Sequence, residues 1–499
     1  MKMNKCSPFV AALTAVIVAI TVPALAQDSF IAPFTLEKRA AAQHVDRYGD
    51  LALGAVIRTD ERYGRDALFQ GPRGWDYWNL LETPKPDQDP NLWPDKRPTY
   101  FLAQLKMPPE TDLTIRGRFP HARYFKLALY RFERNTFVAL GGEDLAAWDI
   151  EPDPDSANPY IVGADRTITK RNYTVHILTE DAPKSRADRA RNTVYAGKDA
   201  PEIQAVFRIY VSDEGYDGAG IGPADSPSSA GPLFNYEAKI VDGTRLSTDE
   251  IVKRFFRPLG YAPPPMNVDQ WYALVNSKKN DPSLSPATAP ARRDPQFEGF
   301  YGMRYTVAGA FETPEEQAKI KVAAEMEGGG DPSTFYMVNY LSQKFGSVYV
   351  FRAKLPTFPN TYAGAKTMTD TQVKYWSVAT VAAAPSGELW DGVFDMMLPQ
   401  DKDGYYTIVV SRPEDRPKNA TRENGVAWID WGPGEGLGDP RNRKDWGMLL
   451  MRFMVCHPDW ANAPCKVTKP GTEEAIMGPY YPKGYYTTKE EFEAQGPKK

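Results

Sequence analysis

A pattern of alternating apolar and polar residues that ends at a proline occurs twice in this chain of 499 residues. The first copy runs from Leu113 to Pro120, and the second runs from Val348 to Pro356. Alternation of this kind is typical of a half-buried β-strand. Because the pattern recurs far along the chain, we predict a tandem duplication of an all-β unit.

Other parts of the sequence support the duplication, because they match in the same order and with similar gaps. A Glu-Thr-Pro triplet and a threonine followed by two aromatic residues precede each copy of the pattern. Matching segments with strand character follow it. The pairs are 82–84 with 312–314, 99–101 with 334–336, 124–127 with 375–378, 173–177 with 406–410, 180–183 with 414–417 and 206–211 with 450–455.

We therefore expect a mainly β protein that consists of two tandem, internally duplicated β-sandwich or jelly-roll-like modules, with a few peripheral helices. Duplication would also give the two modules matching faces on which to pack. The predicted strands are 99–105, 112–119, 123–132, 171–179 and 204–212 in the first module, and 334–341, 347–355, 373–382, 404–411 and 448–455 in the second.

The N-terminus has the features of a secretory signal peptide. Lys2 and Lys5 precede an apolar run, and Ala24-Leu25-Ala26 fits a cleavage site. A membrane anchor is the alternative, but the run is short for a membrane span. The expected organisation is a signal peptide at 1–26, a helical segment at 27–70, the first module at 71–235, a helix and Pro-rich linker at 236–298, the second module at 299–470, and a tail with a short helix at 471–499.

Charge argues against a nucleic-acid partner, and the cysteines predict a disulfide in an exported protein. Loss of the two signal-peptide lysines would change the net charge from −4 to −6, which gives no reason to expect a nucleic-acid partner. Cys6 would leave with the signal, so Cys456 and Cys465 are predicted to form a disulfide. We expect a periplasmic or secreted location, with no stable membrane insertion after cleavage. The sequence does not indicate an oligomeric state.

Several common catalytic and cofactor motifs are absent from the sequence. There is no Gly-x-Ser-x-Gly, His-Glu-x-x-His or Cys-x-x-Cys-His motif, and the glycine run at 432–438 lacks the setting of a dinucleotide loop. Asp401-Lys402-Asp403-Gly404 favours a hairpin turn over a calcium loop, because no suitably spaced glutamate follows. We expect no cofactor and no metal.

Arginines within predicted strands are the strongest candidates for ligand binding. Such side chains must reach solvent or find a partner, because an unpaired buried charge is costly. Salt bridges or exposure would explain them structurally, and their retention in both modules favours that view. A cleft that binds an anion through bidentate guanidinium contacts is the functional alternative. The candidates are Arg116, Arg118, Arg208, Arg352 and Arg452, together with Trp431 as a ring that could stack on a ligand.

Two histidines and one aspartate offer a catalytic alternative. His121 follows a predicted strand and His176 lies within another, so either could act as a base with Asp213 nearby. They could also share a metal, but the second module has no matching histidines. Ordinary hydrogen-bonded histidines are the simpler expectation.

Several phrases of the sequence resemble those of secreted bacterial proteins of unknown function with tandem β-sandwich-like domains. These phrases lie at 118–125, 208–211, 222–225 and 477–486, and so span most of the chain. The resemblance implies an exported, β-rich protein and supplies no catalytic residues.

From these observations we expect an exported protein that recognises a small organic, anionic or sugar-like ligand in a groove between or beside its two modules. A periplasmic hydrolase or lyase that uses a His/carboxylate pair is one alternative. An envelope scaffold, which would expose a large apolar patch, is another.

Overall fold

The computed structural model describes residues 76–79, 95–133, 136–199, 202–222, 234–257, 291–301, 331, 333–382, 389–434 and 445–496. The expected signal peptide at 1–26, the helical segment at 27–70 and most of the Pro-rich linker lie outside these residues. Within them, no helix is long and apolar enough to cross a membrane.

The first sandwich consists of two mainly antiparallel sheets. Its inner sheet, which faces the second sandwich, has the order β1-β2-β8-β4-β5, with β11 also paired to β2. Its outer sheet has the order β10-β9-β3-β6-β7. The strands are Asp76–Asn79 (β1), Pro98–Leu105 (β2), Asp112–Arg118 (β3), Ala122–Glu133 (β4), Thr136–Ala146 (β5), Asn172–Leu178 (β6), Thr193–Tyr195 (β7), Ile203–Ser212 (β8), Phe234–Lys239 (β9), Arg245–Leu246 (β10) and Phe256–Arg257 (β11).

The second sandwich is built in the same way. Its inner sheet has the order β12-β13-β19-β15-β16, and its outer sheet has the order β18-β17-β14-β20. The strands are Glu298–Gly299 (β12), Thr334–Ser342 (β13), Val348–Lys354 (β14), Tyr375–Val381 (β15), Leu389–Phe394 (β16), Tyr405–Ser411 (β17), Ala427–Asp430 (β18), Trp446–Met454 (β19) and Lys483–Thr487 (β20).

The two sandwiches share unusual details as well as strand order, as expected for tandem β modules. Each outer sheet contains one parallel pair, β6 with β7 and β17 with β18. Val211 near the end of β8 and Val455 just after β19 both have positive φ, at 56° and 55°. A β-branched residue is seldom found in that conformation, so its recurrence at matching places supports duplication.

The matching segments at 99–101 and 334–336 are offset by one residue in the structure. Tyr100 pairs with Arg208 across β2 and β8, whereas the partner of Arg452 across β13 and β19 is Tyr336. Tyr100 and Tyr336 are therefore equivalent. An offset of one residue moves a side chain to the other face of a strand, so the register could be assigned only from the pairing.

The core of each sandwich follows from the alternation. Phe101, Phe207 and Leu127 are neighbours across β2, β8 and β4, and all three are fully buried with Ile115 of the outer sheet. In the second sandwich Trp376 and Phe453 lie in the same way across β15 and β19. Apolar residues on one face of each strand thus fill the space between the two sheets.

Segments expected to connect or follow the modules supply strands to them. β9 pairs with β3, although the boundary was expected at 235, and β20 in the C-terminal tail pairs with β14. Each of these strands precedes a helix with a capping box: α5 (Thr248–Phe255) and α10 (Lys489–Gln495). A further short helix, α9, spans Glu473–Met477.

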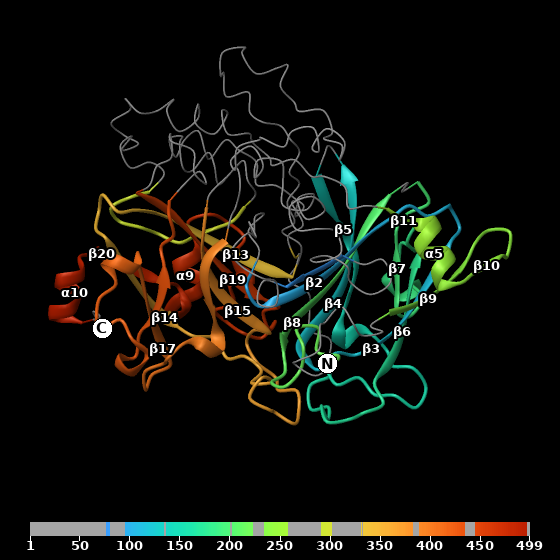
Figure 1. Cartoon of the computed structure of the whole chain (residues 1–499), viewed down its shortest axis with the longest axis horizontal. Coiled ribbons are helices and arrows are strands. Elements are labelled where there is room, and N and C mark those ends of the chain that lie inside the picture. The colour runs from blue at the N-terminus through green and yellow to red at the C-terminus, as the bar shows by residue number, and fades with distance from the viewer. Residues whose placement is uncertain are drawn as a thin grey trace, which may run out of the picture.

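The two inner sheets face each other, so the four sheets form four layers (Figure 1). The rings of Tyr210 on β8 and Tyr375 on β15 lie 5.1 Å apart at this interface. Arg123 and Asp395 form an ion pair across it in which neither side chain is exposed, with N–O distances of 2.8 and 2.7 Å. The expected packing of one module on the other is therefore present.

A second connection between the sandwiches is made by two loops. The Gly163 amide donates to the Met368 carbonyl at 2.8 Å, and the Arg166 amide donates to the Lys366 carbonyl at 2.8 Å. Asp165 and Thr367 form an antiparallel bridge between these bonds. The loops thus pair like short strands.

Candidate ligand-binding site

An open groove of about 510 Å³ lies at one end of the first sandwich. Four parts of the fold meet there: the chain just after β2, the loop between β7 and β8, the β9–β10 hairpin, and the end of α5 with β11. These elements lie at the opposite edge of the molecule from α10 (Figure 1). The lining residues are Lys106, Met107, Pro108, Pro109, Lys198, Asp199, Ile240, Leu246, Arg254, Phe255 and Arg257.

Helix α5 covers this end of the sandwich. A capping box fixes where the helix begins, and two apolar side chains anchor it in the core. The side chains of Ser247 and Glu250 bind each other's backbone amides, which fixes the start of the helix. Ile251 and Phe255 are buried in the core of the first sandwich. The Phe255 carbonyl accepts a hydrogen bond from the Lys106 amide at 2.8 Å, which attaches the end of the helix to the chain after β2.

The rim of the groove is basic. It carries Lys106, Lys198, Arg254 and Arg257 against a single acid, Asp199. Lys198 pairs with Asp181 outside the groove at 3.1 Å. The excess of cations gives the groove a positive potential that would attract an anion.

Apolar side chains form the floor of the groove. Met107, Leu246 and Phe255 are exposed by only 6%, 3% and 4%, and all belong to the core of the first sandwich. Ile240 packs against the same core. The groove therefore combines an apolar base with charged walls, which is the composition of many small-molecule sites.

Three of the arginines predicted from sequence lie on outer sheets, away from this groove. Arg116 on β3 pairs with Glu237 on β9 at 2.6 Å, and Arg118 on the same face is exposed. Arg352 on β14 donates to Asp401 and to Thr407, and its guanidinium lies over the ring of Tyr405. These residues are not brought together.

The other two predicted arginines lie on the facing inner sheets. Arg208 donates to the Tyr130 hydroxyl at 2.6 Å, and Arg452 lies 3.7 Å from Asp95. Both side chains are buried, with 4% and 5% exposure. They occupy equivalent positions on β8 and β19, so the sequence match identified a shared feature of the interface rather than of an open groove.

The charges around these arginines are balanced. Lys126 lies 2.8 Å from Asp331 and 3.0 Å from Asp144. Burial alone would raise the pKa of Asp331, but the neighbouring Lys126 and Arg208 cations lower it. Asp95 also accepts hydrogen bonds from Tyr375 and Ser377, at 2.9 and 2.5 Å. Carboxylates and a tyrosine hydroxyl therefore lie beside Lys126, Arg208 and Arg452.

His121 and Asp213 are close in the fold but do not form an acid–base pair. The Asp213 amide donates to the His121 carbonyl at 2.8 Å, so their backbones are adjacent. The His121 ring stacks on Tyr216 at 4.1 Å, whereas the Asp213 carboxylate is bound by Arg166 at 2.6 and 2.7 Å. Burial, with help from nearby arginines, lowers the pKa of His121 to about 4.

His176 lies apart from these residues, on β6 of the outer sheet. Its Nδ1 atom is 2.8 Å from Asp112 and 3.3 Å from the Thr114 hydroxyl. Its partners thus lie on the neighbouring strand β3, and it is partly exposed. In the described part of the chain, no group of three or more His, Cys, Asp or Glu side chains is arranged to hold a metal ion.

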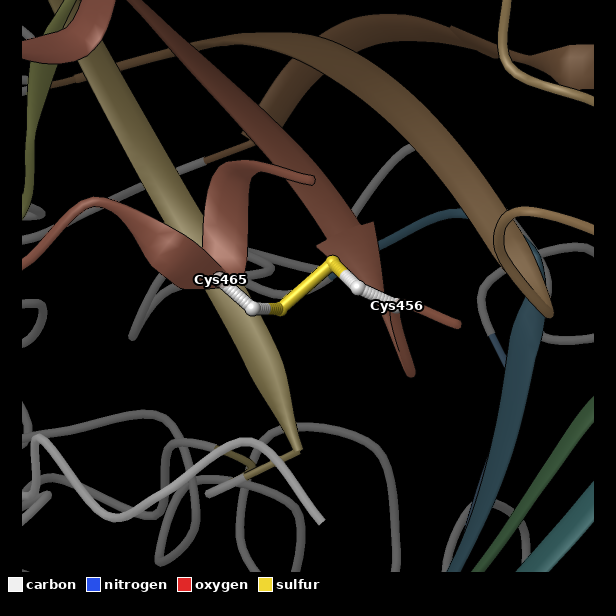
Figure 2. Close-up of a disulfide and its surroundings, with 2 residues drawn as sticks. All are labelled: Cys456 and Cys465. Atoms are coloured by element: carbon white, nitrogen blue, oxygen red, sulfur yellow. A yellow bond between two sulfur atoms is a disulfide. The ribbon is translucent and has the colours of Figure 1, made fainter. Parts of the chain in front are cut away.

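Trp431 lies in the hydrophobic core, and the two cysteines are bonded to each other. Trp431 is fully buried in the second core and donates to the Trp446 carbonyl at 3.0 Å, so its ring is not open to a ligand. Cys456 and Cys465 form the expected disulfide, which joins the chain after β19 to the short helix at Pro464–Lys466 (Figure 2). Asp401 accepts hydrogen bonds from the amides of Asp403 and Tyr405, so this segment is a turn, as expected. It follows the short helix Asp395–Met397 and precedes β17, so it is not the turn of a β-hairpin.

Comparison with known proteins identifies similar structures but no family. No family model matches the chain, and no curated protein matches it. An uncharacterised protein from Burkholderia cenocepacia aligns over 92% of both chains with 12% identity and a TM-score of 0.44. The VPA0106 protein from Vibrio parahaemolyticus aligns over 88% of this chain and 97% of its own, with 14% identity and a TM-score of 0.36. Neither similarity indicates an activity.

Sequence reasoning did not identify the residues of the groove. It recognised the capping box at Ser247 and the helix that follows, but treated this helix as part of a connector. Lys106 and Arg254 lie outside the matching repeats, and nothing local indicates that they face one space. The Pro108-Pro109 pair, which ends β2 beside Lys106, was the available signal that the chain turns there.

Proposed function

We propose that this chain is an exported protein that binds a small organic anion in the groove beside its first sandwich. The observation that carries the proposal is the set of four cationic side chains around an open groove with one acid. Cations of this kind bind carboxylates and phosphates through charge-assisted hydrogen bonds. The disulfide between Cys456 and Cys465 supports export, because such bonds persist in oxidising compartments.

The space between the sandwiches supports ligand binding less well. Arg208 and Arg452 are buried there and already contact Tyr130 and Asp95. An anion would have to displace these partners and separate two packed sheets. The groove beside the first sandwich requires neither change, so we favour it.

The alternatives from sequence have weaker support. A His/carboxylate enzyme needs the two side chains within hydrogen-bond reach, but Asp213 is bound by Arg166 and His121 stacks on Tyr216. His176 does lie 2.8 Å from the Asp112 carboxylate, but neither residue lines the groove. A scaffold would present a large apolar patch. In the described part of the chain, the large apolar residues that are well exposed lie on three separate segments: Ile161, Val162, Val241 and Met397.

The proposal is tested by calorimetry with the secreted form of the protein. Titration calorimetry measures the affinity of the protein for benzoate, hexanoate and a neutral sugar. Thermal unfolding is the second measurement, in which binding of either anion is expected to raise the melting temperature. Lys106→Gln combined with Arg254→Gln should weaken anion binding at least about tenfold, because each removes a charge-assisted contact. Lys253→Gln is the matched control, since Lys253 is exposed on α5 but does not line the groove.

Two results would overturn the proposal. One is the absence of binding by any organic anion. The other is an equal loss of affinity in the Lys253→Gln control, which would indicate a general charge effect rather than binding in the groove.

A further inference from the structure

The floor of the groove is part of the hydrophobic core. Met107, Leu246 and Phe255 pack with the side chains that fill the space between the two sheets of the first sandwich. At this end α5 connects β10, which pairs with β9 of the outer sheet, to β11, which pairs with β2 of the inner sheet. The groove therefore reaches the core of the sandwich, and a ligand that fills it meets apolar atoms.

The four cations of the rim are not equally available to a ligand. Lys198 is paired with Asp181, and Arg257 donates to the Phe256 carbonyl at 2.8 Å. Within the described part of the chain, neither the Lys106 ammonium nor the Arg254 guanidinium forms a salt bridge, although the electrostatic field of Arg254 reaches the carboxylates of Asp242 and Glu250.

These two cations flank one backbone junction. The Lys106 amide bonds to the carbonyl of Phe255, the residue that follows Arg254. An anionic group placed beside this junction would lie within the field of both cations, and Phe255 itself belongs to the apolar floor. The charged and apolar parts of the groove are therefore adjacent.

We infer that the ligand is amphipathic: an alkyl carboxylate whose head group lies beside Lys106 and Arg254 and whose chain lies on Met107, Leu246 and Phe255. This inference rests on the proposed function and restricts its ligand class. Pro108 and Pro109 beside this floor are exposed and Ile240 is partly exposed, and a small hydrophilic anion would leave these apolar residues in water. The open groove has a volume of about 510 Å³, which is within the usual range for small-molecule sites.

Chain length provides the test. Calorimetry compares butanoate, hexanoate, octanoate and decanoate, all as free monomers below the concentration at which they form micelles. Each added methylene that becomes buried should increase affinity about three- to fourfold. The matched alcohols should bind more weakly than the carboxylates, and the Lys106→Gln and Arg254→Gln changes should remove that difference.

Ile240 and Val241 provide a matched pair of variants on one hairpin. Ile240 lines the groove, whereas Val241 is 65% exposed and does not. Ile240→Ser should reduce the gain per methylene, and Val241→Ser should not. Circular dichroism and the melting temperature establish that both variants are folded, and Ile240 is only partly buried, so its replacement is tolerable.

The outcomes separate this inference from the proposed function. If organic anions bind with affinities that do not depend on chain length, the inference is wrong and the proposed function stands. If no organic anion binds, both are wrong. Binding to vesicles that contain an anionic lipid, without binding to any free carboxylate, would also overturn the inference, because the site would then recognise a lipid surface.

Discussion

Lys374 is a buried amine at the interface between the two sandwiches, and it forms no salt bridge with the described residues. It is 2% exposed, and its Nζ atom makes no hydrogen bond within the described part of the chain. It precedes Tyr375 as Arg123 precedes Tyr124, so the two cations occupy equivalent positions. Arg123 pairs with Asp395 at the start of a short helix, but the equivalent helix at Ala147–Asp149 begins with an alanine.

The cost of burying this amine follows from its titration. Burial lowers the pKa of Lys374 from 10.5 to about 8, and Asp370 offsets only part of the effect. Below pH 8 the amine is protonated in both the folded and the unfolded state, and the folded state carries the full cost. As the pH rises from 8 to 10.5 the folded amine is already neutral while the unfolded one still loses its proton, so the cost disappears. The lowered pKa of Lys374 therefore reduces the free energy of unfolding by about 3 kcal/mol at pH 7 and by under about 1 kcal/mol at pH 10.

We therefore predict that Lys374→Met stabilises the protein. The gain in the free energy of unfolding should be about 2–3 kcal/mol at pH 7, because a cation–π contact of the amine with Trp148, worth about 1 kcal/mol, is lost. It should fall below about 1 kcal/mol at pH 10. Urea unfolding of wild type and variant at the two pH values measures this difference.

Lys366→Met is the control, because Lys366 is an exposed lysine on the same loop region and should change stability little at either pH. A Lys374→Met variant that is less stable than wild type at pH 7 would contradict the reasoning. So would a gain that is the same at pH 7 and pH 10, since it would not depend on the protonation of the amine.

Three further predictions concern other residues of the described structure. Replacing Cys456 and Cys465 by serine should lower stability to urea by about 2.7 kcal/mol, since their sequence separation is 9; equal midpoints with and without reductant would contradict this. Arg123→Met should cost about 3–5 kcal/mol by leaving Asp395 buried and unpaired, and Asp395→Leu in the same chain should restore much of the loss. In an NMR titration the His121 ring should stay neutral from pH 8 to pH 5, and a midpoint near 6.5 would show that it is not buried as described.

The predicted strands were found where alternation was clear and missed where it was not. β5 contains Gly141 and Gly142, and its pairing with β4 is interrupted by a bulge, so it lacks a regular alternating pattern. β7 has three residues and β18 has four, which is too short for a pattern to be recognised. These strands form because neighbouring strands offer hydrogen-bonding edges, which a local pattern does not report.

The sequence identified the arginines as unusual but not their roles. Arg208 and Arg452 were expected to have partners or a ligand, and the structure supplies Tyr130 and Asp95. Asp95 lies just before β2 of the first sandwich, whereas Arg452 lies on β19 of the second. No spacing along the chain connects two residues so far apart, so the pairing becomes visible only when the inner sheets face each other.

Alternation and repetition in the sequence alone determined a duplicated β protein, because side chains in a strand alternate between two faces and that period is local. Tertiary structure alone decided where a ligand could bind. α5 and α10 have similar capping boxes and follow equivalent strands, yet Phe255 of α5 enters the core at the end of one sandwich, while Phe492 of α10 packs with Val348 and Val350 on the outer sheet of the other. The groove exists because the end of α5 meets Lys106, from a distant part of the chain, and such a contact depends on packing that no local pattern encodes.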